Sequence, residues 1–210
     1  MKLSRAYARQ VFLNCPFDDN YRPLYEAIIF AAIHCGFVIR CAREREDSGE
    51  TRISKIMEII RASQFGIHDI SRVELDDANH LPRFKMPLEL GLFLGAKAYP
   101  SEPKQKAKRC LILDTQPYRY QKLISDIAGQ DIRAHDGNAG KVLVLTRNWL
   151  ATVSKRNLPG PAELERLYDE FQNELPEILT KLDFDQGGLQ FVEYVKLAME
   201  WLLARQQDSA

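Results

Sequence analysis

A single glutamate, Glu89, has the surroundings in this sequence that most suggest chemistry. It is the only charged residue between Pro87 and Leu94, in a segment otherwise made of leucine, glycine and phenylalanine. Burying a carboxylate in such a segment is costly unless a partner compensates for it. Glu89 either interacts with the N-terminal dipole of a helix or faces a ligand. Gly91 and Gly95 favour the second interpretation, that Glu89 faces a ligand, because glycine lets a helix approach other groups closely.

Further polar side chains follow the apolar runs that predict strands. In an open parallel sheet, ligands bind at the carboxyl ends of the strands, where loops and helix N-termini converge. The residues at these positions are Asn14, Asp18 and Asp19 after the first run, residues 43–47 after the second, His68, Asp69, Ser71 and Arg72 after the third, and residues 114–120 after the fourth.

The adjacent His68 and Asp69 are not expected to act on one atom, because neighbouring strand residues point to opposite faces. Asp69 either lies near the site or caps the next turn. Residues 43–47 alternate in charge, which is typical of a solvated loop with local ion pairs, although Arg43 or Arg45 could instead bind phosphate or ribose. The candidates are Glu89 and Asp69 for catalysis, and Asn14, Phe17, Asp18, Arg43 and Arg72 for substrate binding.

Composition excludes several classes of function. The 29 basic and 29 acidic residues cancel, so the chain has no bulk attraction for nucleic acids. The four cysteines form no C-x-x-C pair, and His34 and His135 have no metal-ligand spacing, so we expect reduced thiols, structural histidines and no metal. Neither G-x-G-x-x-G nor the Walker pattern occurs, and we expect no bound cofactor. No apolar run approaches the ~20 residues that span a bilayer, which predicts a cytoplasmic protein.

The elements that must position these residues alternate between strand and helix. Strands are predicted at residues 11–15, 37–41, 65–70 and 109–114, and helices at 21–35, from 51 onward and at 87–98. This alternation predicts an α/β fold, a flavodoxin- or Rossmann-like three-layer sandwich with a mostly parallel sheet. Residues 119–129 could add a helix. For residues 141–154 periodicity allows a strand or a helix, and we favour a helix.

The character of the chain changes after residue 158. Residues 162–182 and 189–205 predict two amphipathic helices, with Phe191, Leu197 and Trp201 on the inner face. We expect an α/β domain over residues 1–158 and a helical appendage over 159–210 that packs on it. The appendage is the expected interface for a second copy or another protein.

Two motifs resemble known families. Val11-Phe12-Leu13-Asn14-Cys15-Pro16-Phe17 resembles the first strand of nucleoside 2-deoxyribosyltransferases, and Glu89-Leu90-Gly91-Leu92-Phe93-Leu94-Gly95-Ala96-Lys97 resembles their helix with the nucleophilic glutamate. Toll/interleukin-1 receptor (TIR) domains that hydrolyse NAD are similar in layout. The resemblance spans roughly residues 10–115. It implies that Glu89 attacks or stabilises the ribosyl C1′, and that the chain belongs to a bacterial group with a part in defence against phage.

The expected function is therefore an N-glycosidase or ribosyltransferase acting on a nucleotide, with NAD as one candidate substrate. A carboxylate close to C1′ stabilises the cationic sugar that forms as the base departs. Asn14, Asp18 and Asp69 could hold ribose hydroxyls, while Arg43 or Arg72 could meet phosphate. The alternative is a non-catalytic module that senses a nucleotide signal and passes it to a partner.

Overall fold

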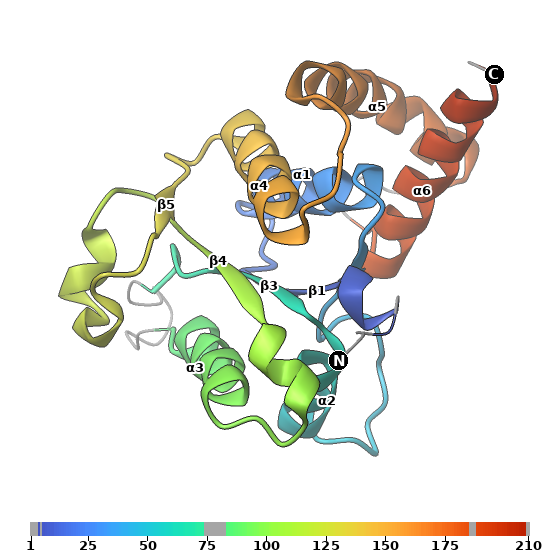
Figure 1. Cartoon of the computed structure of the whole chain (residues 1–210). Helices are drawn as coiled ribbons and strands as arrows, with labels where there is room; N and C mark the ends of the chain where they lie inside the picture. The colour runs from blue at the N-terminus through green and yellow to red at the C-terminus, as the bar shows by residue number, and fades with distance from the viewer. Residues whose placement is uncertain (1–3, 5, 74–82, 185–187, 209–210) are drawn as a thin grey trace. The chain divides into compact units, whose positions relative to one another are not determined.

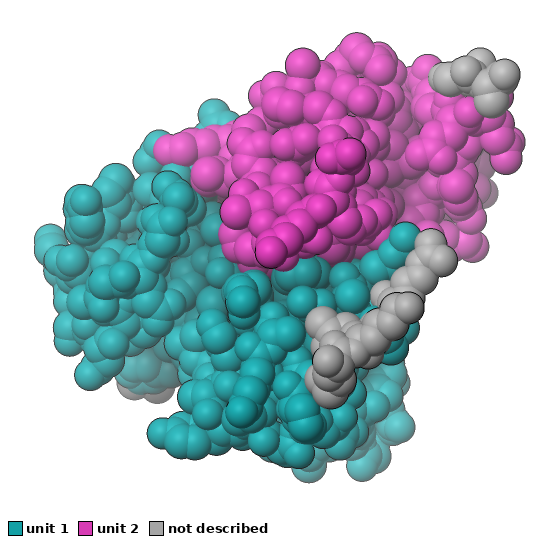
Figure 2. Space-filling view, in the orientation of Figure 1, with its two compact units in different colours: residues 1–17, 38–138 teal, residues 18–37, 139–210 magenta. Residues whose placement is uncertain are grey.

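The chain forms the helices and strands drawn in Figure 1, a computed structural model that describes residues 4, 6–73, 83–184 and 188–208. It divides into two compact units (Figure 2). The first comprises Met1–Phe17 and Val38–Asn138, and the second comprises Asp18–Phe37 and Ala139–Ala210. This division differs from the expected boundary at residue 158, because the second unit also takes in two helices from earlier in the chain.

The first unit holds a five-stranded, all-parallel sheet of order β2-β1-β3-β4-β5. The strands are β1 (Gln10–Asn14), β2 (Val38–Arg40), β3 (Phe65–Asp69), β4 (Arg109–Asp114) and β5 (Arg133–Ala134). The α/β class of flavodoxin type is thereby confirmed, since this strand order is the flavodoxin order. The order reverses between β1 and β3, where Asn14 lies opposite His68. Such a switch point is where open parallel sheets bind ligands.

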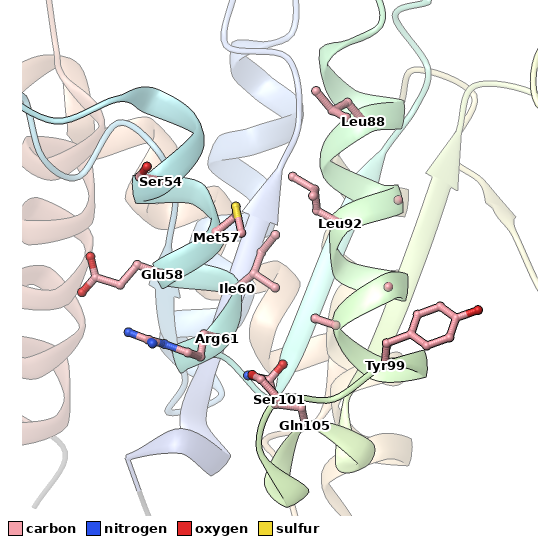
Figure 3. A pocket seen from close by; sticks show the side chains of 13 residues that line it. Ser54, Met57, Glu58, Ile60, Arg61, Leu88, Leu92, Tyr99, Ser101 and Gln105 are labelled. Carbon is pink, nitrogen blue, oxygen red and sulfur yellow. The ribbon is translucent and has the colours of Figure 1, made fainter.

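Two helices of this unit, α2 (Arg52–Ala62) and α3 (Lys85–Ala98), lie side by side on one face of the sheet (Figure 1). Their apolar residues pack with the sheet in a buried cluster that contains Phe12, Ile56, Ile59, Ile60 and Phe93. A groove runs between the outward faces of the two helices (Figure 3).

Close packing under α3 requires a glycine in β3. A Cβ atom at Gly66 would lie 2.7 Å from His68 Nε2 and 2.8 Å from Phe93 Cε2, closer than van der Waals contact allows. Gly66 therefore lets the ring of Phe93 pack directly on the strand.

The helix that residues 119–129 could have added does not form. Two short 3₁₀ helices occupy this stretch, Arg119–Lys122 and Ser125–Ile127, followed by the short strand β5. Tyr118 has a left-handed backbone with φ 62°, which no regular helix continues through. Tyr120 and Ile127 still reach the core, where they pack with Ile70, Leu90 and Ile112. The two turns thus bury their apolar residues without a regular helix.

The second unit is helical and is built around α1 (Arg22–His34), with α4 (Ala139–Ser154), α5 (Pro161–Lys181) and α6 (Phe191–Asp208). The helices expected near residues 141–154, 162–182 and 189–205 are confirmed. Phe30 of α1 stacks on Phe171 of α5 at 5.4 Å between ring centroids, and Trp201 of α6 lies 5.4 Å from Phe171. No helix in the described part of the chain is both long and apolar enough to cross a membrane.

This aromatic cluster predicts a large loss of stability for Phe171→Ala. Phe171 is fully buried, so the substitution removes its contacts and leaves a cavity, and the free energy of unfolding should fall by about 3–5 kcal/mol. Phe84→Ala is the matched control, since Phe84 is 69% exposed and should change this energy by less than about 1 kcal/mol. Urea unfolding measures both, and equal losses at the two positions would contradict the packing described.

Candidate functional site

Asn14, the last residue of β1, joins the two sides of the switch point. Its buried Nδ2 donates to the backbone oxygen of Met86 at 2.9 Å, in the first turn of α3, and lies 3.1 Å from His68 Nδ1. An amide nitrogen can only donate, so His68 Nδ1 accepts and the ring proton is on Nε2. Asn14 thereby fixes the start of α3 against the ends of β1 and β3.

His68 is held in its neutral form. Burial, together with the positive charge of Lys108, lowers the pKa of His68 to about 3. Its ring packs edge-on against Phe12 and Phe93. His68 and the adjacent Asp69 occupy different surroundings, in keeping with the alternation of a strand.

Asp69 has a polar partner that the sequence did not reveal. Its Oδ2 lies 3.1 Å from Nε2 of His135, and both side chains are fully buried. His135 Nδ1 accepts the backbone N–H of Gly137 at 2.9 Å, which fixes the orientation of the ring. Asp69 Oδ1 accepts the backbone N–H of Ser71 at 2.8 Å, so the residue caps the turn after β3 as well as lying at the strand ends.

Glu89 is not a first-turn charge. Lys85 begins α3, so Glu89 is its fifth residue, beyond the free N–H groups of the helix start. The residue is 6% exposed, and its Oε1 lies 3.6 Å from Nη2 of Arg52, whose side chain is 56% exposed. Burial raises the pKa of Glu89, and Arg52 partly opposes this. The interpretation as a helix-dipole charge therefore does not account for its position.

Cys15, the residue after Asn14, is within electrostatic reach of both candidate carboxylates. Burial raises the pKa of Cys15 well above its usual value, and the charges of Asp69, Cys41 and Glu89 raise it further. The structure thus brings Asn14, Asp69 and Glu89 to one edge of the sheet, around the buried thiol of Cys15. All four cysteines are free, as expected.

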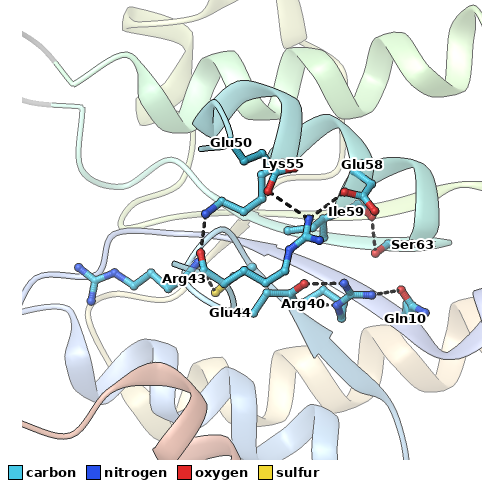
Figure 4. Close-up of polar contacts among 11 residues, drawn as sticks. Gln10, Arg40, Arg43, Glu44, Glu50, Lys55, Glu58, Ile59 and Ser63 are labelled. Carbon is cyan, nitrogen blue, oxygen red and sulfur yellow. Dashed lines mark hydrogen bonds and ion pairs between the residues drawn. The ribbon is translucent and has the colours of Figure 1, made fainter. Parts of the chain in front are cut away.

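The loop after β2 contains a network of ion pairs, as its alternating charges predicted (Figure 4). Arg40 Nε donates to Glu44 at 2.6 Å, and Arg45 pairs with Glu58 at 2.8 Å. Lys55 Nζ donates to the backbone oxygen of Arg45 at 2.5 Å. These bonds commit Arg45 to the loop and leave Arg43 as the arginine of this loop that can reach a ligand.

Arg43 lies over an aromatic ring. Its guanidinium carbon is 4.9 Å from the ring centroid of the half-buried Phe17, and Arg43 forms no ion pair with any described residue. Arg72 is half-buried just beyond Asp69. Asp18 belongs to the second unit, where its Oδ1 accepts the N–H of Tyr21 at 3.1 Å before α1. We therefore do not count Asp18 among the clustered residues.

A further buried carboxylate, besides Asp69 and Glu89, fixes the loop after β3. Asp114, the last residue of β4, accepts a hydrogen bond from Arg119 Nε at 2.8 Å. The same guanidinium donates through Nη2 to the backbone oxygens of Ser71 at 2.7 Å and Ile70 at 3.1 Å. Asp114 therefore has a structural role, since its charge pairs with Arg119 and this pair holds the strand ends.

Among the described residues, no group of three or more His, Cys, Asp or Glu side chains is placed to hold a metal ion.

No protein-family model, curated protein or solved structure matches this chain. The resemblance to deoxyribosyltransferases and TIR domains therefore stays a prediction from two short motifs. Sequence reasoning expected His135 to be a structural histidine and missed its contact with Asp69, and it missed Arg52 altogether. The position of His135 directly after a strand would have been the signal for it, but β5 is only two residues long.

The buried His68 predicts a specific loss of stability in acid. Unfolded His68 binds a proton near its ordinary pKa of 6.5, whereas the folded residue does so only near 3, so the unfolded state binds more protons between these values. Stability should therefore fall as the pH falls through this window, by about 3 kcal/mol between pH 7 and about pH 4. His68→Gln keeps an acceptor for Asn14 but cannot titrate. The free energy of unfolding, measured with urea at each pH, should fall less steeply with falling pH in the variant than in the wild type. If the two proteins lose stability in parallel, His68 is not the group responsible.

Proposed function

We propose that this protein cleaves the N-glycosidic bond of a nucleotide, with Glu89 as nucleophile or as stabiliser of the cationic sugar. The observation that carries the proposal is a buried carboxylate of raised pKa beside the β1/β3 switch point. A structural glutamate would be expected to have a buried partner, whereas Arg52 is half exposed and 3.6 Å away. The positive charge of a cationic sugar could replace that of Arg52 beside the Glu89 carboxylate.

The chemistry suits a carboxylate held out of water. As the bond to the base breaks, positive charge develops on the sugar, and a nearby negative charge in a low-dielectric site lowers the barrier. Burial also makes the Glu89 carboxylate more basic, which favours attack on C1′. A pyridinium base such as nicotinamide departs as a neutral molecule and needs no acid to protonate it. NAD is therefore the first substrate to test.

The surrounding residues supply contacts for the rest of a nucleotide. Arg43, with no ion pair to a described residue, can meet a phosphate, and the Phe17 ring beneath it offers an apolar surface for a base. Asp69 can accept from a ribose hydroxyl while the N–H of Ser71 and the contact with the His135 ring hold its carboxylate in place. A role in bacterial defence against phage belongs to the same proposal and rests on the resemblance alone.

Glu89→Gln tests the proposal, because it preserves side-chain volume and removes the charge. The wild type is incubated with NAD and a panel of nucleosides and nucleotides, and base release is followed by chromatography. Turnover by the variant should fall roughly a hundredfold or more, a loss of about 3 kcal/mol of transition-state stabilisation, with nucleotide affinity little changed.

Glu26→Gln is the matched control. Glu26 is also a buried helical glutamate, whose pKa burial raises to about 7, but it lies in the second unit. Its substitution should leave turnover unchanged. An active Glu89→Gln variant would end the glycosidase proposal. A wild type that binds a nucleotide without releasing its base would instead support the sensor alternative.

A further inference from the structure

The groove between α2 and α3 is a second candidate site, separate from the strand ends. Its volume is about 800 Å³. Figure 3 shows the side chains that line it. Its walls are apolar, with Met57 and Ile60 on the α2 side and Leu88 and Leu92 on the α3 side. This volume falls in the range of small-molecule sites, which are typically apolar with a few polar groups.

Two glycines leave the α3 side of the groove open. A Cβ atom built at Gly91 or at Gly95 meets no atom within 4 Å. Neither residue has a positive φ, the backbone conformation that would require glycine. The missing side chains therefore provide space along the groove and are not required by the backbone.

Polar groups gather at one end of the groove, where Gln105, Ser101 and Arg61 line it. Gln105 is only 2% exposed, yet its side chain forms no hydrogen bond within the described chain. The Gln105 amide is not among the fully buried polar atoms that lack a partner, and Gln105 lines the groove, so a ligand there can form a hydrogen bond with this amide. This observation is independent of the glycines.

The same end carries the exposed positive charge of Arg61, which lies near the carboxylates of Glu58 and Glu102. Arg61 forms no ion pair with a described residue. The two nearby carboxylates are already engaged, Glu58 with Arg45 at 2.8 Å and Glu102 with Lys104 at 2.8 Å. A ligand group at this end is therefore expected to be an anion that accepts hydrogen bonds.

We propose that the groove binds a small anionic amphiphile, with its carboxylate at Arg61 and Gln105 and its apolar chain along the glycines toward Leu88. The α3 helix of a second copy is a less suitable occupant of the groove. Its exposed charged residues are Lys85 and Lys97, and both would be repelled by Arg61 of the first copy. The site is independent of the function proposed for Glu89, which does not line the groove.

The test compares three probes with the same chain and different heads: decanoate, decanol and decyltrimethylammonium, each below its micellar concentration. Binding to the full chain is measured by isothermal titration calorimetry. Decanoate should bind roughly five- to tenfold more tightly than the other two, because charged hydrogen bonds to Arg61 add to the apolar contact. Arg61→Gln should abolish this preference, and Arg61→Lys should keep part of it.

Gly95→Leu fills the groove and should abolish binding of all three probes. Gly160→Leu is the matched control, since a Cβ there also meets no atom within 4 Å, and it should leave binding unchanged. Circular dichroism confirms that each variant is folded. The proposal is overturned if decanoate does not bind, if the three probes bind equally, or if Gly95→Leu still binds. It is also overturned if the wild type is a dimer that Gly95→Leu converts to a monomer, because the groove would then be a contact between copies.

Discussion

The side-chain amide of Asn14 is the interaction on which the arrangement of the site depends. A buried amide must find partners, and Asn14 finds them on another strand at His68 and on a helix at Met86. These bonds join three segments that lie far apart in the sequence. They hold the first turn of α3 at the strand ends and so place Glu89, one turn later, beside the switch point of the sheet.

The two carboxylates of the site differ in how they are held. Asp69 is surrounded by groups that fix it, the ring of His135 on one oxygen and the N–H of Ser71 on the other. Glu89 has a longer contact with an arginine that is half exposed. A rigid acceptor beside a less restrained carboxylate is an arrangement in which one group can orient a ligand while the other reacts.

The sequence predicts those features that depend on local pattern. The continuous apolar run of β4 is located to the residue, and Glu89 is identified by its contrast with its neighbours. The features that were missed depend on long-range partners. Arg52 and Glu89 lie 37 positions apart, and nothing near either residue indicates the other. β5 has two residues, too few for any periodicity, and His135 could not be placed without it.

The central helix of the second unit is separated in sequence from the helices that cover it. On the ribosome, α1 emerges more than a hundred residues before α4, α5 and α6. Its apolar side chains, buried in the finished protein, have no helical partners of their own unit during that interval. Vectorial synthesis therefore delays completion of this unit until the last helix is made.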